Sequence, residues 1–452
     1  MVKSLTSGNP LKLIISFAIP IMLGNLVQQL YNLADSVMVG KLIGNEALGA
    51  VGSTGSIVFL IFGFINGISE GSCMLVARYF GAKDHTTMKR CIANIIYVLL
   101  FVTVIISALS FAFSTEILTF MKTPPDIIDL ANDYIELIYL GMIATMIYNL
   151  CAGLLRAVGD SRSPLIFLMI SAVLNVILNY VLIAVIPLGV RGAALATVLA
   201  QLFSGLCCVV YIVKKCKLLC FSAEHMKPSG RLIGQICAMG LPMGFQYSIT
   251  AIGAVVLQSA INSLGSLTVT AYAAADKILT PCWQVLNCAC VAIANFCSQN
   301  LGAGNLRRVK KGLRDGGLFI FGVSAAVSLV LFFFGPTASL IFLDEYNAEI
   351  ESCISTYYKI LAPLFPTLVL VGIFRNTVQG LGFSFQAMFS GALELIARCT
   401  LAIVFVPIYG YAAACLASPI AWIMADCLLI PLYFYGIHKL SKQHPDWCDK
   451  PI

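Results

Sequence analysis

Charged side chains are scarce in this sequence. Only 11% of its 452 residues are Asp, Glu, Lys or Arg, whereas 59% are hydrophobic and the mean hydropathy is +0.92. Soluble domains have about a quarter of their residues charged, so the composition excludes a soluble enzyme. The 28 Lys and Arg residues are spread over many short segments rather than gathered in one basic cluster, which excludes a nucleic-acid-binding protein.

Clusters that could hold a metal ion or a disulfide framework are also missing. The chain has only four histidines, all in polar segments, so we expect no metal site and no resident cofactor. The 17 cysteines are odd in number, contain no C-x-x-C pair and stand mostly inside apolar runs, which predicts buried free thiols. No DDxxD-type aspartate cluster is present, which argues against a membrane-embedded prenyl transferase. We expect no enzymatic activity.

Long apolar segments dominate what is present. A membrane-spanning helix needs about 20 mostly apolar residues, because it must cross roughly 30 Å of hydrocarbon. We therefore predict an all-α polytopic membrane protein with twelve transmembrane helices. The predicted spans are 12–39, 50–77, 91–115, 132–156, 164–186, 190–213, 232–261, 269–298, 313–341, 352–378, 385–407 and 411–437.

The positions of Lys and Arg predict the orientation of these spans. Cytoplasmic segments of membrane proteins carry an excess of Lys and Arg. If the amino terminus is inside, most of the basic residues fall in cytoplasmic segments and the outer loops hold only three. Both termini are therefore predicted to be cytoplasmic.

The two halves of the sequence repeat each other. Pro20 in FAIPIMLGN aligns with Pro242 in MGLPMGFQY, and ALGAVGSTG aligns with VTAYAAADK, both at a shift of 222 residues. GVRGAALAT and GYAAACLAS align at nearly the same shift. The repeat thus predicts a six-helix bundle from each half. Because six is an even number, both bundles begin on the same side of the membrane and share one orientation. They are then related by a pseudo-two-fold axis along the membrane normal. The predicted parts are an amino-terminal lobe (1–213), a cytoplasmic linker (214–231), a carboxy-terminal lobe (232–438) and a cytoplasmic tail (439–452).

The first span contains a carboxyl at membrane depth. An ionisable group there costs on the order of 2.5–3.5 kcal/mol, so it requires an explanation. Asp35 is preceded by Asn25, Gln28, Gln29 and Asn32, which follow one helix face. A seam of inter-helix hydrogen bonds would explain the amides, but a carboxyl is a costly way to make one. We expect this face to line a cavity, with Asp35 in a functional role.

Polar residues in the fifth and sixth spans suggest partners for this carboxyl. Ser171, Asn175 and Asn179 share one face of the fifth span, and Thr197 lies in the sixth. If they surround Asp35, it is a single carboxyl among neutral neighbours. Because burial disfavours the charged form, such a group can load a proton from one side and release it when its exposure changes. We predict an ion-coupling site of Asp35, Asn175, Asn179 and Thr197.

The second half offers other charges at membrane depth. Asp276 and Lys277 are adjacent and point about 100° apart, so they cannot pair directly. Glu394 and Arg398 are four residues apart, which permits either a local ion pair or a charged lining that meets substrate. Asp426 has no assigned role. The predicted substrate-cavity residues are Gln28, Asn32, Gln246, Gln258, Asp276, Glu394 and Arg398.

Two further features concern motion. Proline removes a helical hydrogen bond and kinks the helix. Pro20 therefore gives either a static kink or a hinge in the helix that carries Asp35. Glu70 lies near the inner end of the second span, where Arg78 could satisfy it, and we predict an inner gate from these two residues.

Two stretches together resemble a known family. LKLIISFAIPIMLGNLVQQLYNLADSVMVGKLIGNEALGAVGSTG, followed by GISEGSCMLVARYFGAKD, resembles the opening of the multidrug and toxic compound extrusion (MATE) transporters, and LLRAVGDSRSP and GVRGAALAT extend the resemblance over the whole chain. It implies a bacterial, DinF- or NorM-like antiporter of the cell membrane. Such a protein exports amphipathic organic cations in exchange for inward protons or sodium ions by rocking two lobes, and we expect a monomer. The family's coupling aspartate maps onto Asp35 and its bending proline onto Pro20.

The chain departs from the family pattern in ways that bear on the driving ion. Some relatives have an aspartate where this sequence has Asn179, and NorM-like relatives have acids in the seventh and tenth spans, where this chain offers Gln246, Gln258 and Arg375. Sodium favours charged oxygen ligands, so we predict proton coupling through Asp35.

Two other transport functions stay open. The first is a sodium-coupled antiporter of the same family. The second is a flippase of a lipid-linked saccharide, which would favour a strongly cationic cavity, whereas Lys277 and Arg398 here are accompanied by Asp276 and Glu394.

Overall fold

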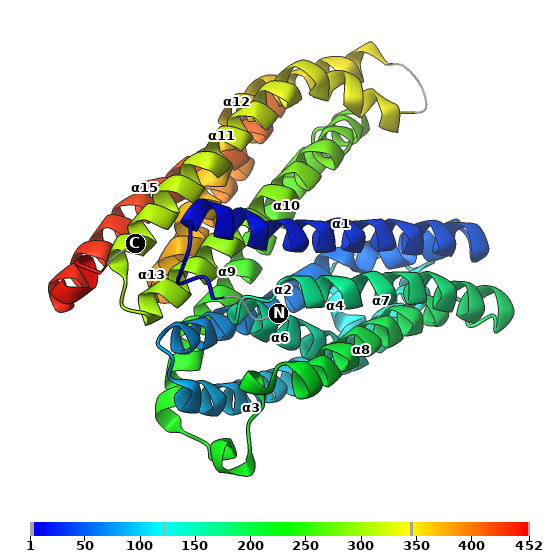
Figure 1. Cartoon of the computed structure of the whole chain (residues 1–452). Helices are drawn as coiled ribbons and strands as arrows, with labels where there is room; N and C mark the ends of the chain where they lie inside the picture. Colours follow the sequence, from blue (N-terminus) through cyan, green and yellow to red (C-terminus); the bar gives the residue numbers. More distant parts are fainter. Residues whose placement is uncertain (1–3, 122, 344–346, 451–452) are drawn as a thin grey trace. The chain divides into compact units, whose positions relative to one another are not determined.

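The computed structural model describes residues 4–121, 123–343 and 347–450, and nearly all of them are helical (Figure 1). Residues 1–3 of the predicted amino-terminal lobe and 451–452 of the predicted tail lie outside the described residues. The α-helices are α1 (Pro10–Leu42), α2 (Asn45–Gly81), α3 (His85–Ala112), α4 (Ser114–Phe120), α5 (Ile128–Leu140), α6 (Met142–Ala157), α7 (Arg162–Tyr180), α8 (Val190–Lys215), α9 (Gly230–Asn262), α10 (Ser266–Gly302), α11 (Leu306–Ser339), α12 (Ala348–Gly380), α13 (Ser384–Thr400), α14 (Val406–Tyr409) and α15 (Tyr411–Gln443).

The helices have the lengths and compositions of membrane spans. Within the described residues, 11 helical segments are long and apolar enough to cross a membrane. The pair α5 and α6 passes the same test as one span that is bent by 46° at Gly141. The predicted all-α polytopic fold is therefore confirmed, and the span predicted at 132–156 is the bent pair.

The chain packs into two compact units. The first unit contains Leu23–Gly244, and the second contains Leu5–Met22 together with the described residues from Phe245 onward. The boundaries divide α1 and α9, and each lies two residues beyond a proline within the helix, Pro20 in α1 and Pro242 in α9. Since proline cannot donate the helical hydrogen bond, α1 and α9 each lack one backbone hydrogen bond close to the residue where the chain crosses from one unit to the other.

Local backbone features repeat between the units. A π-helix follows α7 at Val181–Val185, and another follows α13 at Leu401–Phe405. Gly189 and Gly410 precede α8 and α15 with φ of 58° and 62°, a left-handed conformation that favours glycine. The internal repeat seen in the sequence is thus present in the backbone of both units.

Close backbone packing joins α2 to the amino-terminal part of α9 inside the first unit. A Cβ added to Gly67 would lie 2.7 Å from the Cα of Gly244, and one added to Gly71 would lie 2.6 Å from the carbonyl oxygen of Met239. Only glycine permits this approach, because the neighbouring atoms are backbone atoms that cannot rotate away.

Replacing Gly71 with alanine should therefore destabilise the first unit. Overpacking of this kind costs about 1–3 kcal/mol, and we expect a lower apparent melting temperature of the purified protein in detergent. Gly55→Ala on the same helix is the matched control, because nothing lies within 4 Å of a Cβ at that position. Equal melting temperatures for the two variants would show that the crossing tolerates a methyl group.

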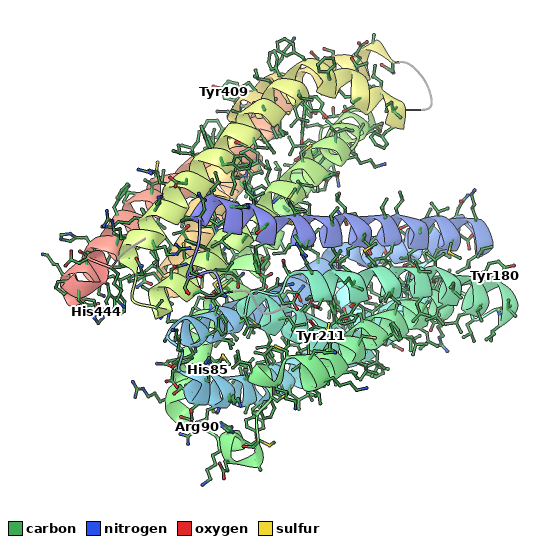
Figure 2. The ribbon with its side chains drawn as sticks, viewed as in Figure 1. His85, Arg90, Tyr180, Tyr211, Tyr409 and His444 are labelled. Carbon is green, nitrogen blue, oxygen red and sulfur yellow. The ribbon has the colours of Figure 1, made fainter. Side chains whose placement is uncertain are left out.

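Asp160 fixes the start of α7 and ties it to α8. This carboxyl is only 3% exposed. Its Oδ1 accepts hydrogen bonds from the backbone N–H groups of Arg162 and Ser163, both at 3.1 Å. Its Oδ2 accepts hydrogen bonds from the hydroxyls of Ser163 at 2.7 Å and of Tyr211 on α8 at 3.1 Å (Figure 2). Burial raises the pKa of Asp160, but the hydrogen bonds from Ser163 outweigh it and hold the pKa below its usual range. These bonds position the two helices that carry most of the predicted coupling residues.

Replacing Asp160 with alanine should lower the melting temperature strongly. The substitution leaves buried donors unpaired, at about 1–3 kcal/mol each, whereas Asp160→Asn keeps one acceptor oxygen and should lie in between. Because the pKa is depressed in the folded state, the stabilisation is present above the unfolded-state pKa of about 3.9 and is lost as pH falls through the lower folded-state value. Wild type should thus lose stability in acid more steeply than Asp160→Asn. Parallel acid profiles would contradict this role.

Candidate functional site

The predicted coupling residues form one chain of hydrogen bonds in the first unit. Asp35 on α1 is 9% exposed, and its Oδ1 accepts a hydrogen bond from Nδ2 of Asn179 on α7 at 2.5 Å. The same Nδ2 lies 3.2 Å from Oδ1 of Asn175, whose own Nδ2 donates to Oγ1 of Thr197 on α8 at 3.4 Å. The structure therefore brings all four residues together from three helices.

The sequence of α7 explains this arrangement. Ser171, Asn175 and Asn179 recur every four residues, so they share one face, and the hydroxyl of Ser171 donates to the carbonyl oxygen of Ala200 on α8 at 2.6 Å. The α-helix changes to the π-helix Val181–Val185 directly after this face. Such π segments frequently occur at functional sites.

Two tyrosines that were not predicted from the sequence, Tyr31 and Tyr134, lie near the carboxyl of Asp35. Tyr31, one turn before Asp35, accepts a hydrogen bond from Nε2 of Gln201 at 3.3 Å. Tyr134 on α5 is also close enough to Asp35 to interact with it electrostatically. The spacing of four residues could have indicated Tyr31, whereas no local pattern indicates Tyr134, which arrives from a distant part of the chain.

The amides that precede Asp35 take different positions. Gln28 is half-buried and forms a side-chain hydrogen bond with Tyr31, so it belongs to the surroundings of the coupling residues. Asn32 is exposed and reaches Gln29 at 3.5 Å. The structure thus connects Gln28 with the Asp35 chain and places Asn32 on the exposed side of α1.

Glu394 and Arg398 belong to an ion-pair cluster in the second unit. Oε2 of Glu394 lies 3.6 Å from Nη2 of Arg398, and Oε1 accepts a short hydrogen bond from Nη2 of Arg375 on α12. Arg375 also donates to the hydroxyl of Ser390. Glu394 is 3% exposed. The ion pair that the spacing permits is therefore present. Arg375, for which no role was predicted from the sequence, adds a second cation to Glu394 from α12.

Asp276 on α10 makes hydrogen bonds that are separate from this ion-pair cluster. Its Oδ2 accepts the hydroxyl of Thr280 at 3.0 Å, and its Oδ1 accepts the hydroxyl of Tyr357 at 3.4 Å. The adjacent Lys277 is exposed and lies 5.3 Å from the centre of the Phe342 ring. As expected from their angular separation, the two adjacent charges make separate contacts.

The two glutamines of α9 also lie in different surroundings. Gln246 is buried and accepts a hydrogen bond from Nε2 of Gln379 at 2.8 Å. Gln258 is exposed and donates to Asn262 at 2.9 Å. The substrate-cavity candidates of the second unit are thus distributed rather than gathered at one point.

The predicted gate residues lie on α2, and the predicted hinge residue lies on α1. Glu70 and Arg78 are both half-buried on α2, in the first unit, and Glu70 adjoins the glycine crossing at Gly71. Pro20 lies within α1, at the passage between the units.

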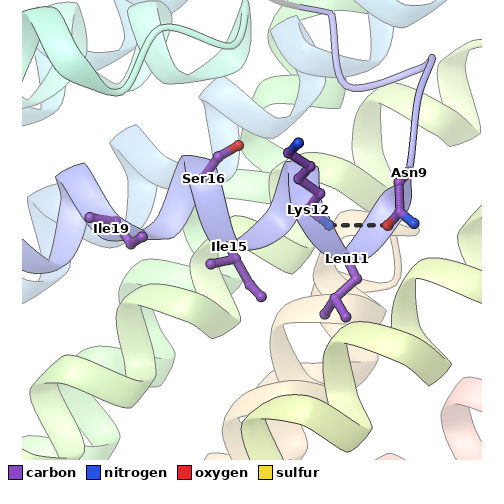
Figure 3. A pocket seen from close by; sticks show the side chains of 6 residues that line it. All are labelled: Asn9, Leu11, Lys12, Ile15, Ser16 and Ile19. Atoms are coloured by element: carbon purple, nitrogen blue, oxygen red, sulfur yellow. Dashed lines mark hydrogen bonds between the residues drawn. The ribbon is translucent and has the colours of Figure 1, made fainter.

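A shallow pocket of about 410 Å³ runs along the start of α1 (Figure 3). Its lining contains none of the predicted site residues and one charged group, and consists of Asn9, Leu11, Lys12, Ile15, Ser16 and Ile19. Within the described residues, no group of three or more His, Cys, Asp or Glu side chains could hold a metal ion. The 17 cysteines are all free thiols.

Comparison with known proteins adds a family and a set of relatives. Residues 20–181 and 242–405 each match the MatE family model, and the two matches begin at Pro20 and Pro242. The chain is 28% identical over 441 residues to the "Probable multidrug resistance protein YpnP" of Bacillus subtilis (strain 168), which covers 97% of this chain and 98% of that protein. It is 21% identical over 385 residues to the "Multidrug export protein MepA" of Staphylococcus aureus (strain N315), covering 84% of this chain and 85% of that protein.

Solved structures share the fold. One, titled "Outward-facing conformation of a multidrug resistance MATE family transporter of the MOP superfamily", superposes with a TM-score of 0.88 at 22% identity and covers 97% of both chains. Another, "Crystal structure of MATE in the bent conformation", gives a TM-score of 0.89 at 22% identity and covers 98% of both chains.

Proposed function

The chain belongs to the MatE family of membrane transporters, and from that premise we propose that it is a secondary active antiporter. It exports amphipathic organic cations, drugs or toxins among them, in exchange for inward protons. Asp35 is the coupling carboxyl. The observation that carries the proposal is the hydrogen-bonded chain of Asp35, Asn179, Asn175 and Thr197, in which one buried carboxyl is surrounded by neutral groups.

The geometry around Asp35 favours a proton over a sodium ion. Sodium, a hard cation, prefers several oxygen ligands, of which carboxylates are the strongest, but Asn179 presents an N–H donor to the only carboxyl of this chain of bonds. The amide of Asn179 also has a buried Oδ1 without a hydrogen-bond partner among the described residues. By rotating, the amide can donate to the ionised carboxylate or accept from the protonated acid, so it supports both states of a proton carrier.

We propose that alternating access moves this proton. Asp35 is loaded from outside, and it releases the proton to the cytoplasm after the exposure of the site changes. The helix α1 carries Asp35 in the first unit and enters the second unit beside Pro20. A change of bend at Pro20 therefore alters the course of the helix that holds the coupling carboxyl. Glu70 and Arg78 serve as the inner gate.

The proposed substrate contacts combine polar and acidic groups. We propose that Gln28, Asn32, Gln246 and Gln258 offer hydrogen bonds to the exported compound, and that Asp276 offers negative charge. The remaining two candidates, Glu394 and Arg398, pair with each other, and Glu394 also pairs with Arg375. We propose that they form a fixed wall, in which both guanidinium groups are held by the single carboxylate of Glu394.

We also propose a cellular location and an oligomeric state for the protein. It is a multi-pass protein of the bacterial cytoplasmic membrane with both termini inside, and it works as a monomer among membrane lipids. The ion gradient supplies the energy for transport, and the protein needs no bound cofactor.

Transport by purified protein in liposomes tests the substrate class. With an imposed proton gradient, we expect movement of the cationic dye ethidium and no movement of an anionic dye of similar size, relative to protein-free liposomes. Movement of the anionic dye alone, or flipping of a lipid-linked saccharide without ethidium transport, would contradict the export of cations.

A further inference from the structure

Asp426 is a buried carboxyl that the proposed coupling mechanism does not use. It lies on α15 in the second unit and is only 7% exposed. Its Oδ1 is buried and accepts no hydrogen bond from the described residues. Buried polar atoms nearly always have a partner, so this oxygen requires an explanation.

The charged groups around Asp426 come from the two helices on which α15 mainly packs. Arg375 of α12 and Glu394 of α13 are close enough to act on its carboxyl electrostatically. Of the other elements that contact α15, the π-helix Leu401–Phe405 and α14 carry no charged side chain, and the 3-10 helix Pro445–Cys448 carries Asp446, which is exposed beyond the end of α15. Asp426 therefore faces one guanidinium and one carboxylate.

The guanidinium groups of the cluster are already engaged elsewhere. Arg375 donates to Glu394 and to the hydroxyl of Ser390. Arg398 pairs with Glu394 and donates to the carbonyl oxygen of Thr250 at 3.5 Å. Glu394 thus pairs with both arginines, whereas Asp426, the second buried carboxyl of this region, pairs with neither.

An ionised carboxylate that is buried without donors is strongly disfavoured, and such groups take up a proton instead. In the arrangement seen here both arginines are bound to Glu394 and neither is bound to Asp426, as expected when Asp426 is neutral. Loss of a proton from Asp426 would give Arg375 a second carboxylate to bind. A metal cation is a poor alternative occupant, because the arginine charges of the cluster would repel it.

We propose that Asp426 is a second proton-binding carboxyl of the transporter, located in the second unit, and that Arg375 takes the place of the proton when it leaves. This inference goes beyond the coupling role of Asp35. It adds, in the second unit, a second carboxyl that carries a proton, and it makes the Arg375 and Glu394 ion pair dependent on the state of Asp426.

Infrared difference spectroscopy between alkaline and acidic buffer tests the proposal, because a protonated carboxylic acid has its own carbonyl stretching band. We expect the purified protein to gain such bands on acidification and Asp426→Asn to lack one of them. Glu349→Gln on the same cluster-bearing helix α12 is the matched control, since Glu349 is exposed in the first turn and should leave the buried-acid bands unchanged.

Two further variants keep the test decisive. If Asp426→Asn does not fold, Asp426→Glu should shift the band rather than remove it. Asp35→Asn should remove a different band, so the two proposals can fail separately. A spectrum of Asp426→Asn identical to that of wild type, or one of Asp426→Glu with no shifted band, would show that Asp426 binds no proton, whatever the outcome at Asp35.

Discussion

Replacing Asp35 with asparagine should reduce proton-driven ethidium export to the level of protein-free liposomes. The variant keeps the size of the side chain and a group that can hydrogen bond to Asn179, so insertion and folding should be intact. It cannot exchange a proton, however, and the imposed gradient then has no group through which to act. The measurement is dye transport in liposomes with equal amounts of reconstituted protein.

Two controls separate lost coupling from lost protein. Glu46→Gln makes the same carboxyl-to-amide change at an exposed position of α2, and it should transport like wild type. Dye exchange without any ion gradient should persist in Asp35→Asn, because the substrate contacts are unchanged. Gradient-driven transport by Asp35→Asn at the wild-type rate would remove Asp35 from the mechanism.

Replacing Asn179 with aspartate should change the driving ion. The new carboxyl would lie where Nδ2 of Asn179 now approaches Oδ1 of Asp35 to 2.5 Å. Two carboxyls so close cannot both ionise without a cation between them, so they either share a proton or bind a metal ion. With Thr197 and Asn175 supplying further oxygens, we expect sodium-driven ethidium export to appear and the proton-driven rate at neutral pH to fall about tenfold or more, which corresponds to roughly 1.4 kcal/mol in the coupling step.

Asn175→Asp is the matched control for this change. It adds the same charge to the same chain of hydrogen bonds, one helical turn away, where the side chain contacts Thr197 and Asn179 rather than Asp35. It should gain much less sodium response. If Asn179→Asp responded to both gradients as wild type does, the amide at this position would have no part in ion selection.

Much of the first unit's site could be predicted because its signals are local. Asp35 is a single acid in an apolar span, and Asn175 and Asn179 are spaced by one turn, which places them on one face. The meeting of these residues with Thr197 follows from the packing of α7 on α8, and the structure shows it directly. The bend at Gly141 was not predicted, because the apolar run continues through it without a change in composition.

The cluster of the second unit could be predicted only in part. The spacing of Glu394 and Arg398 indicates a pair, but Arg375 and Asp426 stand on other helices, and no periodicity in the sequence relates them to that pair. Interactions of this kind depend on which helix faces meet. Tyr134 was missed for the same reason, since it reaches Asp35 from α5.

Transport in liposomes with separately imposed gradients tests the central claim most directly. Purified protein is reconstituted with the membrane potential clamped, and ethidium transport is followed first with a proton gradient at equal sodium and then with a sodium gradient at equal pH. Proton coupling through Asp35 predicts transport in the first condition and none above background in the second. Transport driven by sodium at fixed pH, with no response to the proton gradient, would contradict it.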